Sequence, residues 1–185
     1  MLNKRELNFI DARLGLELDE LQVACPTAYL PPFLLQATLP HAKPKGTHFE
    51  RGSSRLKLSI VANAKFGLPY GMMPRLLLAW ICTEACRTQS QHLDLGKAQS
   101  HFLKQLKLPS DGRYIKTLHT QILALLWSQI SVAVSGSGSL SFENLYIAKN
   151  KNDFLNSAHP AGRFLWNSSL RLSDEFYDVL IKSAV

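Results

Sequence analysis

The chain has few cysteines and no apolar segment long enough to cross a membrane. Its three cysteines, Cys25, Cys82 and Cys86, are too few and too apolar in context for a disulfide framework. The longest uninterrupted apolar run, residues 76–82, is far shorter than the roughly 18 uncharged residues that a spanning helix needs. The first residues, MLNKREL, lack the apolar core of a signal peptide. These absences exclude disulfide-rich and membrane-spanning classes and predict a cytoplasmic protein.

The sequence also lacks the residue patterns of catalytic and metal sites. Gly96, Lys97 and Ala98 do not make a phosphate-binding loop, because the required glycine and hydroxyl are missing. There is no paired-carboxylate signal, no Ser-His-Asp signal and no His-x-His pair beside a tyrosine. Cys82 and Cys86 share a helix face, but a zinc site would need two more ligands. We predict a protein that is not an enzyme and that uses no cofactor and no metal.

Positive charge is unevenly distributed along the chain, whose net charge is +7. Residues 97–119 carry five basic side chains against one acidic side chain, and residues 41–57 carry the same balance. The first twenty-two residues are acidic, with three basic and five acidic side chains. Clustered Lys and Arg attract polyanions by neutralising phosphates and releasing counterions. The pattern favours a nucleic-acid partner, with a basic, solvated surface as the alternative.

The hydrophobic pattern predicts three successive helices and then a β-hairpin. Residues 74–88 are apolar nearly all round, which is typical of a helix inside a domain. Residues 94–108 and 113–129 repeat their apolar positions at helical spacing. The period then changes to 2 over residues 130–148, which a glycine–serine turn interrupts. Three helices followed by a hairpin is the order of a winged helix.

The flanking segments predict further elements. They are a helix at 6–23, a strand at 33–39, a loop at 41–54, a strand at 56–62, a strand within 163–172 and a helix capped by Ser173. We therefore predict an α+β fold. It is a winged helix, with a three-helix core and a β-hairpin wing, plus an N-terminal extension of helix and strand. The expected domains are an N-terminal arm at 1–40 and a winged-helix domain at 41–185.

The outer face of the third predicted helix carries the candidates for base contact. Arg113, Lys116, Thr117 and Thr120 lie at i, i+3, i+4 and i+7 and therefore share one stripe. Such side chains suit phosphates and base edges in a major groove. The basic residues expected to hold backbone phosphates lie near the second helix and at the end of the wing: Lys97, Lys104, Lys107, Lys149 and Lys151.

The second half of the third helix is too apolar for the same role. Residues 122–127 read ILALLW, whereas only about half of a surface helix should be apolar. Leu123 and Trp127 are therefore predicted to face a partner subunit. Trp80 and Trp127 are also aromatic platforms on which bases could stack, although their leucine neighbours favour packing.

Three segments of the sequence resemble plasmid replication initiator proteins of the RepA type: FLLQATLPHAKP, LSIVANAKFGLPYGMMPRLLLAWICTEACRTQSQHLDLG and FLWNSSLRLSDEFYDVLI. The succession LPYG, PRLLLAW and TEACRT is the most recognisable part, and the similarity extends over residues 29–185. The resemblance implies a winged-helix initiator that binds repeated double-stranded origin sequences, self-associates and recruits host replication factors. It also implies that relatives continue beyond the equivalent of Val185 into a second winged-helix domain.

The leading hypothesis is therefore a cytoplasmic bacterial initiator, or its N-terminal winged-helix domain. Its partners would be double-stranded DNA of a plasmid origin, a second copy of the chain in a homodimer, and host replication proteins or other nucleoprotein subunits, with no membrane. The alternative is a dimerisation or scaffold subunit that keeps the fold without sequence-specific DNA binding of its own. An RNA-binding winged helix is a third reading, because charge alone does not separate DNA from RNA.

Overall fold

Helices and antiparallel strands form an α+β fold in the computed structural model of the chain, which describes residues 29–36, 38–53, 56–134, 141–151 and 169–183. The elements in chain order are α2 (Pro32–Gln36), β1 (His48–Gly52), β2 (Leu56–Val61), α3 (Met72–Thr88), β3 (His92–Asp94), α4 (Gln99–Gln105), α5 (Gly112–Leu126), β4 (Gln129–Val134), β5 (Ser141–Leu145), β6 (Ser169–Arg171) and α6 (Asp174–Ser183). The predicted helix at 6–23 and the glycine–serine turn lie outside the described residues.

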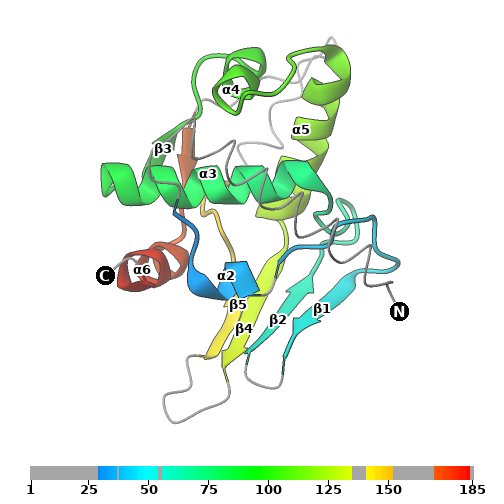
Figure 1. The fold of residues 1–185 in the computed structure, drawn as a ribbon, viewed down its shortest axis with the longest axis vertical. Helices are drawn as coiled ribbons and strands as arrows, with labels where there is room; N and C mark the ends of the chain where they lie inside the picture. The colour runs from blue at the N-terminus through cyan, green and yellow to red at the C-terminus, as the bar shows by residue number, and fades with distance from the viewer. Residues whose placement is uncertain (1–28, 37, 54–55, 135–140, 152–168, 184–185) are drawn as a thin grey trace.

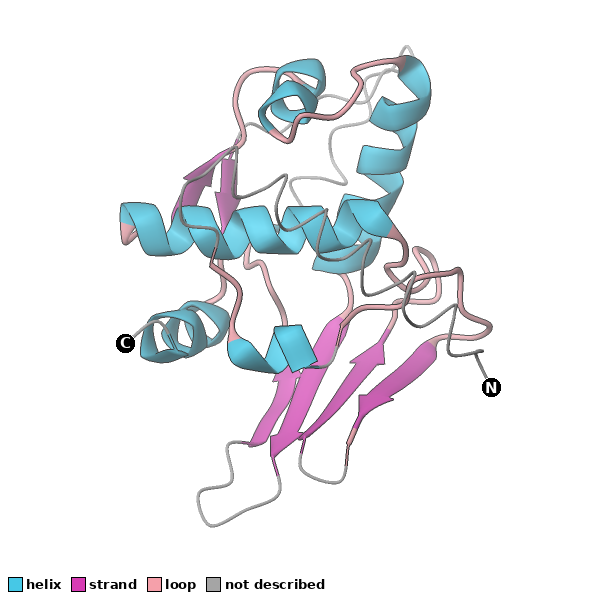
Figure 2. Ribbon diagram, in the orientation of Figure 1, coloured by secondary structure: helices cyan, strands magenta, loops and turns pink. Residues whose placement is uncertain are grey.

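Helix α3 crosses the middle of the molecule (Figure 1). The four-stranded sheet lies on one side of α3, while α4 and most of α5 lie on the other, as Figure 2 shows by secondary structure. Contacts of α3 with α5, α6 and β3 make it the centre of the packing. Its position is the one predicted from an apolar sequence, since such a helix must be covered on several sides.

The larger sheet is antiparallel throughout, in the order β1-β2-β4-β5. Strand β2 alternates, so that Leu58 and Ile60 are fully buried while Lys57 and Val61 are exposed. This alternation confirms the predicted half-buried strand. Strand β4 lies between β2 and β5, so the predicted hairpin is part of a wider sheet. A second, two-stranded sheet joins β3 to β6.

The buried faces of α3 explain its lack of a polar stripe. Leu77, Ile81 and Ala85 belong to the main core, whereas Leu76 and Ala79 form a second cluster on another side of the helix. The second cluster also holds partly buried apolar side chains: Leu30, Met72 and Leu108. None of the described helices, α3 included, has both the length and the apolar character needed to cross a membrane.

Three sequence predictions need correction. The strand at 33–39 is wrong, because Pro32 begins the short helix α2 and Leu34 is buried in the core. The loop at 41–54 contains β1, which pairs along its whole length with β2. The second core helix is shorter than predicted, since Asp94 ends β3 and α4 begins only at Gln99. Strand pairing decides the second and third cases, because β1 pairs with β2 and β3 with β6.

Other boundaries follow their sequence signals closely. Asp111 caps α5 through its carboxylate, which accepts hydrogen bonds from the backbone N–H groups of Arg113 at 2.9 Å and Tyr114 at 3.0 Å. Ser173 caps α6 as predicted, with its hydroxyl accepting from Phe176 N–H at 3.1 Å. Helix α5 ends at Leu126, so Gln129 belongs to β4 instead of the helix.

Candidate nucleic-acid interface

Helix α5 separates an apolar face from a polar one. Leu118, Ile122 and Leu125 are buried in the core on the inner face. The four residues of the predicted stripe are exposed: Arg113, Lys116, Thr117 and Thr120. The Thr117 hydroxyl donates to the carbonyl of Arg113, and that of Thr120 donates to the carbonyl of Lys116, both at 2.9 Å. These bonds use the hydroxyl protons, so each threonine oxygen retains lone pairs that can accept a hydrogen bond.

Helix α4 and its flanks bring three exposed lysines to the same part of the molecule. Lys97 precedes α4, Lys104 lies in its last turn and Lys107 follows it. Lys107 adopts a left-handed conformation, with φ of 54°, and its N–H donates to the carbonyl of Lys104 at 3.0 Å. This turn ends α4 and leads the chain towards α5, against which α4 packs.

The α4–α5 basic surface is defined here as Lys97, Lys104, Lys107, Arg113 and Lys116 with the adjoining Thr117 and Thr120. Among the described residues, none of its five cations takes part in an ion pair. Three basic side chains elsewhere are paired with carboxylates: Lys57 lies 2.6 Å from Glu50, Arg87 2.5 Å from Glu84 and Lys149 2.7 Å from Asp174. The α4–α5 basic surface therefore carries positive charge that no carboxylate of the described residues pairs with.

Lys149 and Lys151 do not join this surface. They follow β5 at the open end of the β4–β5 hairpin, opposite its turn. Leu145 pairs with Ile130 at this end. The Lys149 ammonium donates to Asp174, and this bond lowers the pKa of that carboxyl group. The Lys151 ammonium lies over aromatic rings at the far end of α5. Both lysines follow the wing in sequence, as expected, but non-local contacts hold their ammonium groups apart from the α4–α5 basic surface. Their contact with backbone phosphates stays a prediction.

Leu123 and Trp127 pack within the chain. Leu123 is only 7% exposed and belongs to the main core. Trp127 is partly buried, and its ring centroid lies 5.5 Å from that of Phe66. Their role at a partner interface stays a prediction, although these intrachain contacts already account for the apolar second half of α5. Trp80 likewise packs edge-on against Phe102, with 4.8 Å between ring centroids.

Gln121 is a buried polar residue that positions α5, and the sequence gives little sign of it. Gln121 is 4% exposed on the core side of α5, and its side-chain carbonyl accepts a hydrogen bond from Tyr70 N–H at 2.9 Å. Tyr70 belongs to the LPYG segment before α3, where Gly71 has φ of 83° and donates its N–H to the carbonyl of Pro40. The lone glutamine among leucines is the one hint in the sequence. The contact fixes α5 against the start of α3.

The model for the family described as plasmid encoded RepA protein matches residues 68–185, which begin at this LPYG segment and include the α4–α5 basic surface. The chain belongs to the plasmid-encoded RepA family. The comparison with curated proteins and the comparison with solved structures each found no match.

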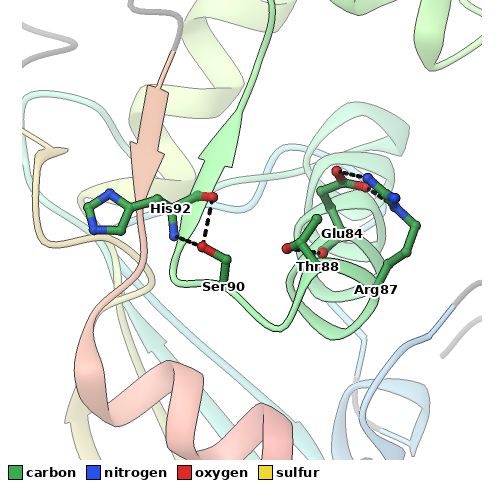
Figure 3. A network of polar contacts seen from close by, with 5 residues as sticks. All are labelled: Glu84, Arg87, Thr88, Ser90 and His92. Atoms are coloured by element: carbon green, nitrogen blue, oxygen red, sulfur yellow. Dashed lines mark hydrogen bonds and ion pairs between the residues drawn. The ribbon is translucent and has the colours of Figure 1, made fainter.

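In this RepA-family chain the TEACRT segment forms the end of α3 and holds the backbone at Tyr29 in place. The buried Thr83 hydroxyl donates to the carbonyl of Ala79 at 2.7 Å and accepts from Tyr29 N–H at 2.8 Å. One turn later, Glu84 and Arg87 form an exposed ion pair (Figure 3). Through Thr83, the segment therefore anchors the backbone at Tyr29, just before α2, to helix α3.

The chain leaving α3 is held by the next polar contacts. The Thr88 hydroxyl donates to the carbonyl of Glu84 at 2.7 Å, and Gln89 ends the helix in a left-handed conformation. The Ser90 hydroxyl then accepts from His92 N–H at 3.0 Å where β3 begins, as Figure 3 shows. The most recognisable residues of the RepA phrase thus shape the scaffold behind the basic surface instead of contributing to that surface.

Of the two cysteines of α3 in this RepA-family protein, Cys82 belongs to the main core and Cys86 does not. Cys82 is fully buried, and burial raises the pKa of its thiol well above the ordinary value. Burial also raises the pKa of the partly exposed Cys86. A thiol with a raised pKa stays protonated at neutral pH, and a protonated thiol is a weak nucleophile. This protonation agrees with a packing role.

Proposed function

We propose that this RepA-family chain is a plasmid replication initiator that binds double-stranded DNA through the α4–α5 basic surface. The observation that carries the proposal is the set of five cations that form no ion pair with the described residues, beside the exposed Thr117 and Thr120 on α5. Clustered, uncompensated Lys and Arg favour the phosphate backbone. A helix face with Arg, Lys and Thr adds groups that bind base edges.

The order of the elements supports α5 as the helix that reads DNA. Helices α3, α4 and α5 followed by the β4–β5 hairpin have the succession of a winged helix, whose last core helix enters the major groove by its N-terminal half. Arg113 and Lys116 lie in that half, directly after the Asp111 cap. The lysines of α4 would then contact phosphates beside the groove. In this arrangement the β4–β5 hairpin acts as the wing. Strand β2 pairs with β4 on the side that faces away from β5.

A pair of double variants tests this function. Arg113→Ala with Lys116→Ala removes two unpaired cations, whereas Lys57→Ala with Lys149→Ala removes two cations that are already paired. Both variants have the same net charge. Fluorescence anisotropy with a labelled duplex should show at least about tenfold weaker binding for the first variant and little change for the second. Equal affinities of the two variants would contradict the assignment.

We also propose that the initiator recognises repeated origin sequences and self-associates. Selection of bound duplexes from a random-sequence pool would reveal a repeat, and sedimentation at several concentrations would reveal a dimer. The alternative role as a scaffold subunit receives less support, since Leu123 lies in the core and Trp127 packs on Phe66. A monomer that selects no sequence would overturn both parts of this proposal.

A further inference from the structure

A second cluster of basic and aromatic side chains lies at the C-terminal end of α5. Its aromatic members come from three segments that meet there: Phe66 after β2, Trp127 at the end of α5 and Tyr146 after β5. The lysines Lys65 and Lys151 lie over their rings. Figure 1 shows that α5 leads directly into β4 at this place. We call these five residues the aromatic–lysine cluster.

The cluster is separate from the α4–α5 basic surface. Trp127 follows Arg113 by fourteen residues, which corresponds to about 21 Å along a helix. One major groove, about 12 Å wide, cannot bring both ends of α5 into contact with the same bases. The cluster therefore needs an explanation of its own.

The lysines of the cluster have no acidic partner among the described residues. The Lys151 ammonium lies 3.3 Å from the centroid of the Tyr146 ring and 5.0 Å from that of Trp127. Lys65 is exposed, with its ammonium 5.5 Å from the centroid of Phe66. Partial burial lowers the pKa of Lys151, and no carboxylate of the described residues pairs with its ammonium. Both cations can bind an anion without first breaking an ion pair.

Trp127 adds an unused donor. Its indole N–H is buried and has no acceptor among the described residues, although the ring as a whole is partly exposed. Tyr146 is also partly exposed, and its hydroxyl is held by the Gln129 amide. A purely apolar packing cluster gains nothing from a buried N–H without an acceptor. The buried N–H is out of reach of a ligand, so the partly exposed rings and the two cations are the groups that the cluster offers to a flat, anionic ligand.

We infer that the aromatic–lysine cluster binds an unpaired nucleic-acid strand, with bases on the rings of Trp127 and Tyr146 and phosphates at Lys65 and Lys151. Aromatic stacking combined with lysine contacts is the usual chemistry of single-strand binding. The ligand is a single strand and not a duplex, because paired bases already stack on one another and expose only their edges. This inference goes beyond the proposed duplex binding and does not depend on it.

The test measures anisotropy of a labelled oligothymidylate, which has no secondary structure, and of a labelled duplex. Trp127→Leu removes one ring, while Lys151→Met removes a charge and keeps the apolar stem. Each should weaken oligothymidylate binding by about tenfold and leave duplex binding unchanged. Lys182→Met, an exposed lysine on α6, is the control for charge alone and should leave both affinities unchanged.

The duplex-binding variant separates the two sites. Arg113→Ala with Lys116→Ala should lose duplex affinity and retain oligothymidylate affinity, so one proposal can fail while the other holds. If oligothymidylate does not bind the full chain, or if it binds Lys151→Met and Trp127→Leu as tightly as the unsubstituted protein, the cluster is a structural cap and the inference is overturned. Lys151→Met retains the packing stem, so its result does not depend on the stability of Trp127→Leu.

Discussion

The side-chain carbonyl of Gln121 accepts a hydrogen bond from the backbone N–H of Tyr70 at 2.9 Å, across 51 residues of sequence. Gln121→Leu keeps the size of the side chain but leaves that N–H without its acceptor. We expect a loss of about 1–3 kcal/mol in the free energy of unfolding, measured by urea denaturation. Gln105→Leu, on the exposed part of α4, is the control and should change stability by less than about 0.5 kcal/mol. If both variants lose the same free energy of unfolding, the hydrogen bond of Gln121 does not stabilise the fold.

Thr83 gives a second test of the scaffold. Thr83→Val is almost isosteric, but it removes the hydroxyl that binds the carbonyl of Ala79 and the N–H of Tyr29. Stability should fall by about 1–3 kcal/mol because the group is buried. Thr88→Val removes a comparable hydroxyl from an exposed position and should change stability by less than about 0.5 kcal/mol. A similar effect at both positions would argue against an anchoring role for Thr83.

The cap of α5 is tested by two substitutions with the same change in charge. Asp111→Ala removes the acceptor for Arg113 N–H and Tyr114 N–H and should cost about 1 kcal/mol of stability. Asp111→Asn keeps a capping oxygen and should retain most of that stability. Urea unfolding of both variants makes the comparison. If the two variants are equally destabilised, lost charge and not lost capping explains the effect.

Stability should depend on pH through His119. Burial lowers the pKa of this imidazole below its ordinary value of 6.5. The unfolded chain therefore takes up a proton near pH 6.5 while the folded chain does not, so stability is fully present above this pH and decreases as the pH falls below it. His119→Gln should flatten that decrease in urea titrations at about pH 5.5 and 7.5. Unchanged pH dependence in the variant would exclude His119 as the cause.

The sequence predicts the elements whose contacts are local or strongly patterned. Helices α3 and α5 follow from long apolar patterns, β2 from strict alternation, and the Ser173 cap from its place before Asp174 and Glu175. The exposed stripe of α5 follows from helical spacing and from the burial of the opposite face. These features depend on residues that are close together in the chain.

The features that the sequence misses depend on distant partners. Strand β3 is three residues long and exists through its pairing with β6, more than seventy residues later. The apolar run of α2 is too short for its period to distinguish helix from strand. Lys149 meets Asp174 across 25 residues of sequence, and Lys151 likewise meets a distant residue, Trp127. Charge counting along the chain cannot separate a lysine that pairs with a carboxylate, such as Lys149, from one that does not.

Salt dependence of duplex binding tests the central claim most directly. If the five cations of the α4–α5 basic surface contact phosphates, the logarithm of the binding constant should fall with the logarithm of salt concentration with a slope of about −4. Arg113→Ala with Lys116→Ala should make the slope shallower by about 2, whereas Lys57→Ala with Lys149→Ala should leave it unchanged. A slope near zero, or the same slope in both double variants, would contradict duplex binding through this surface.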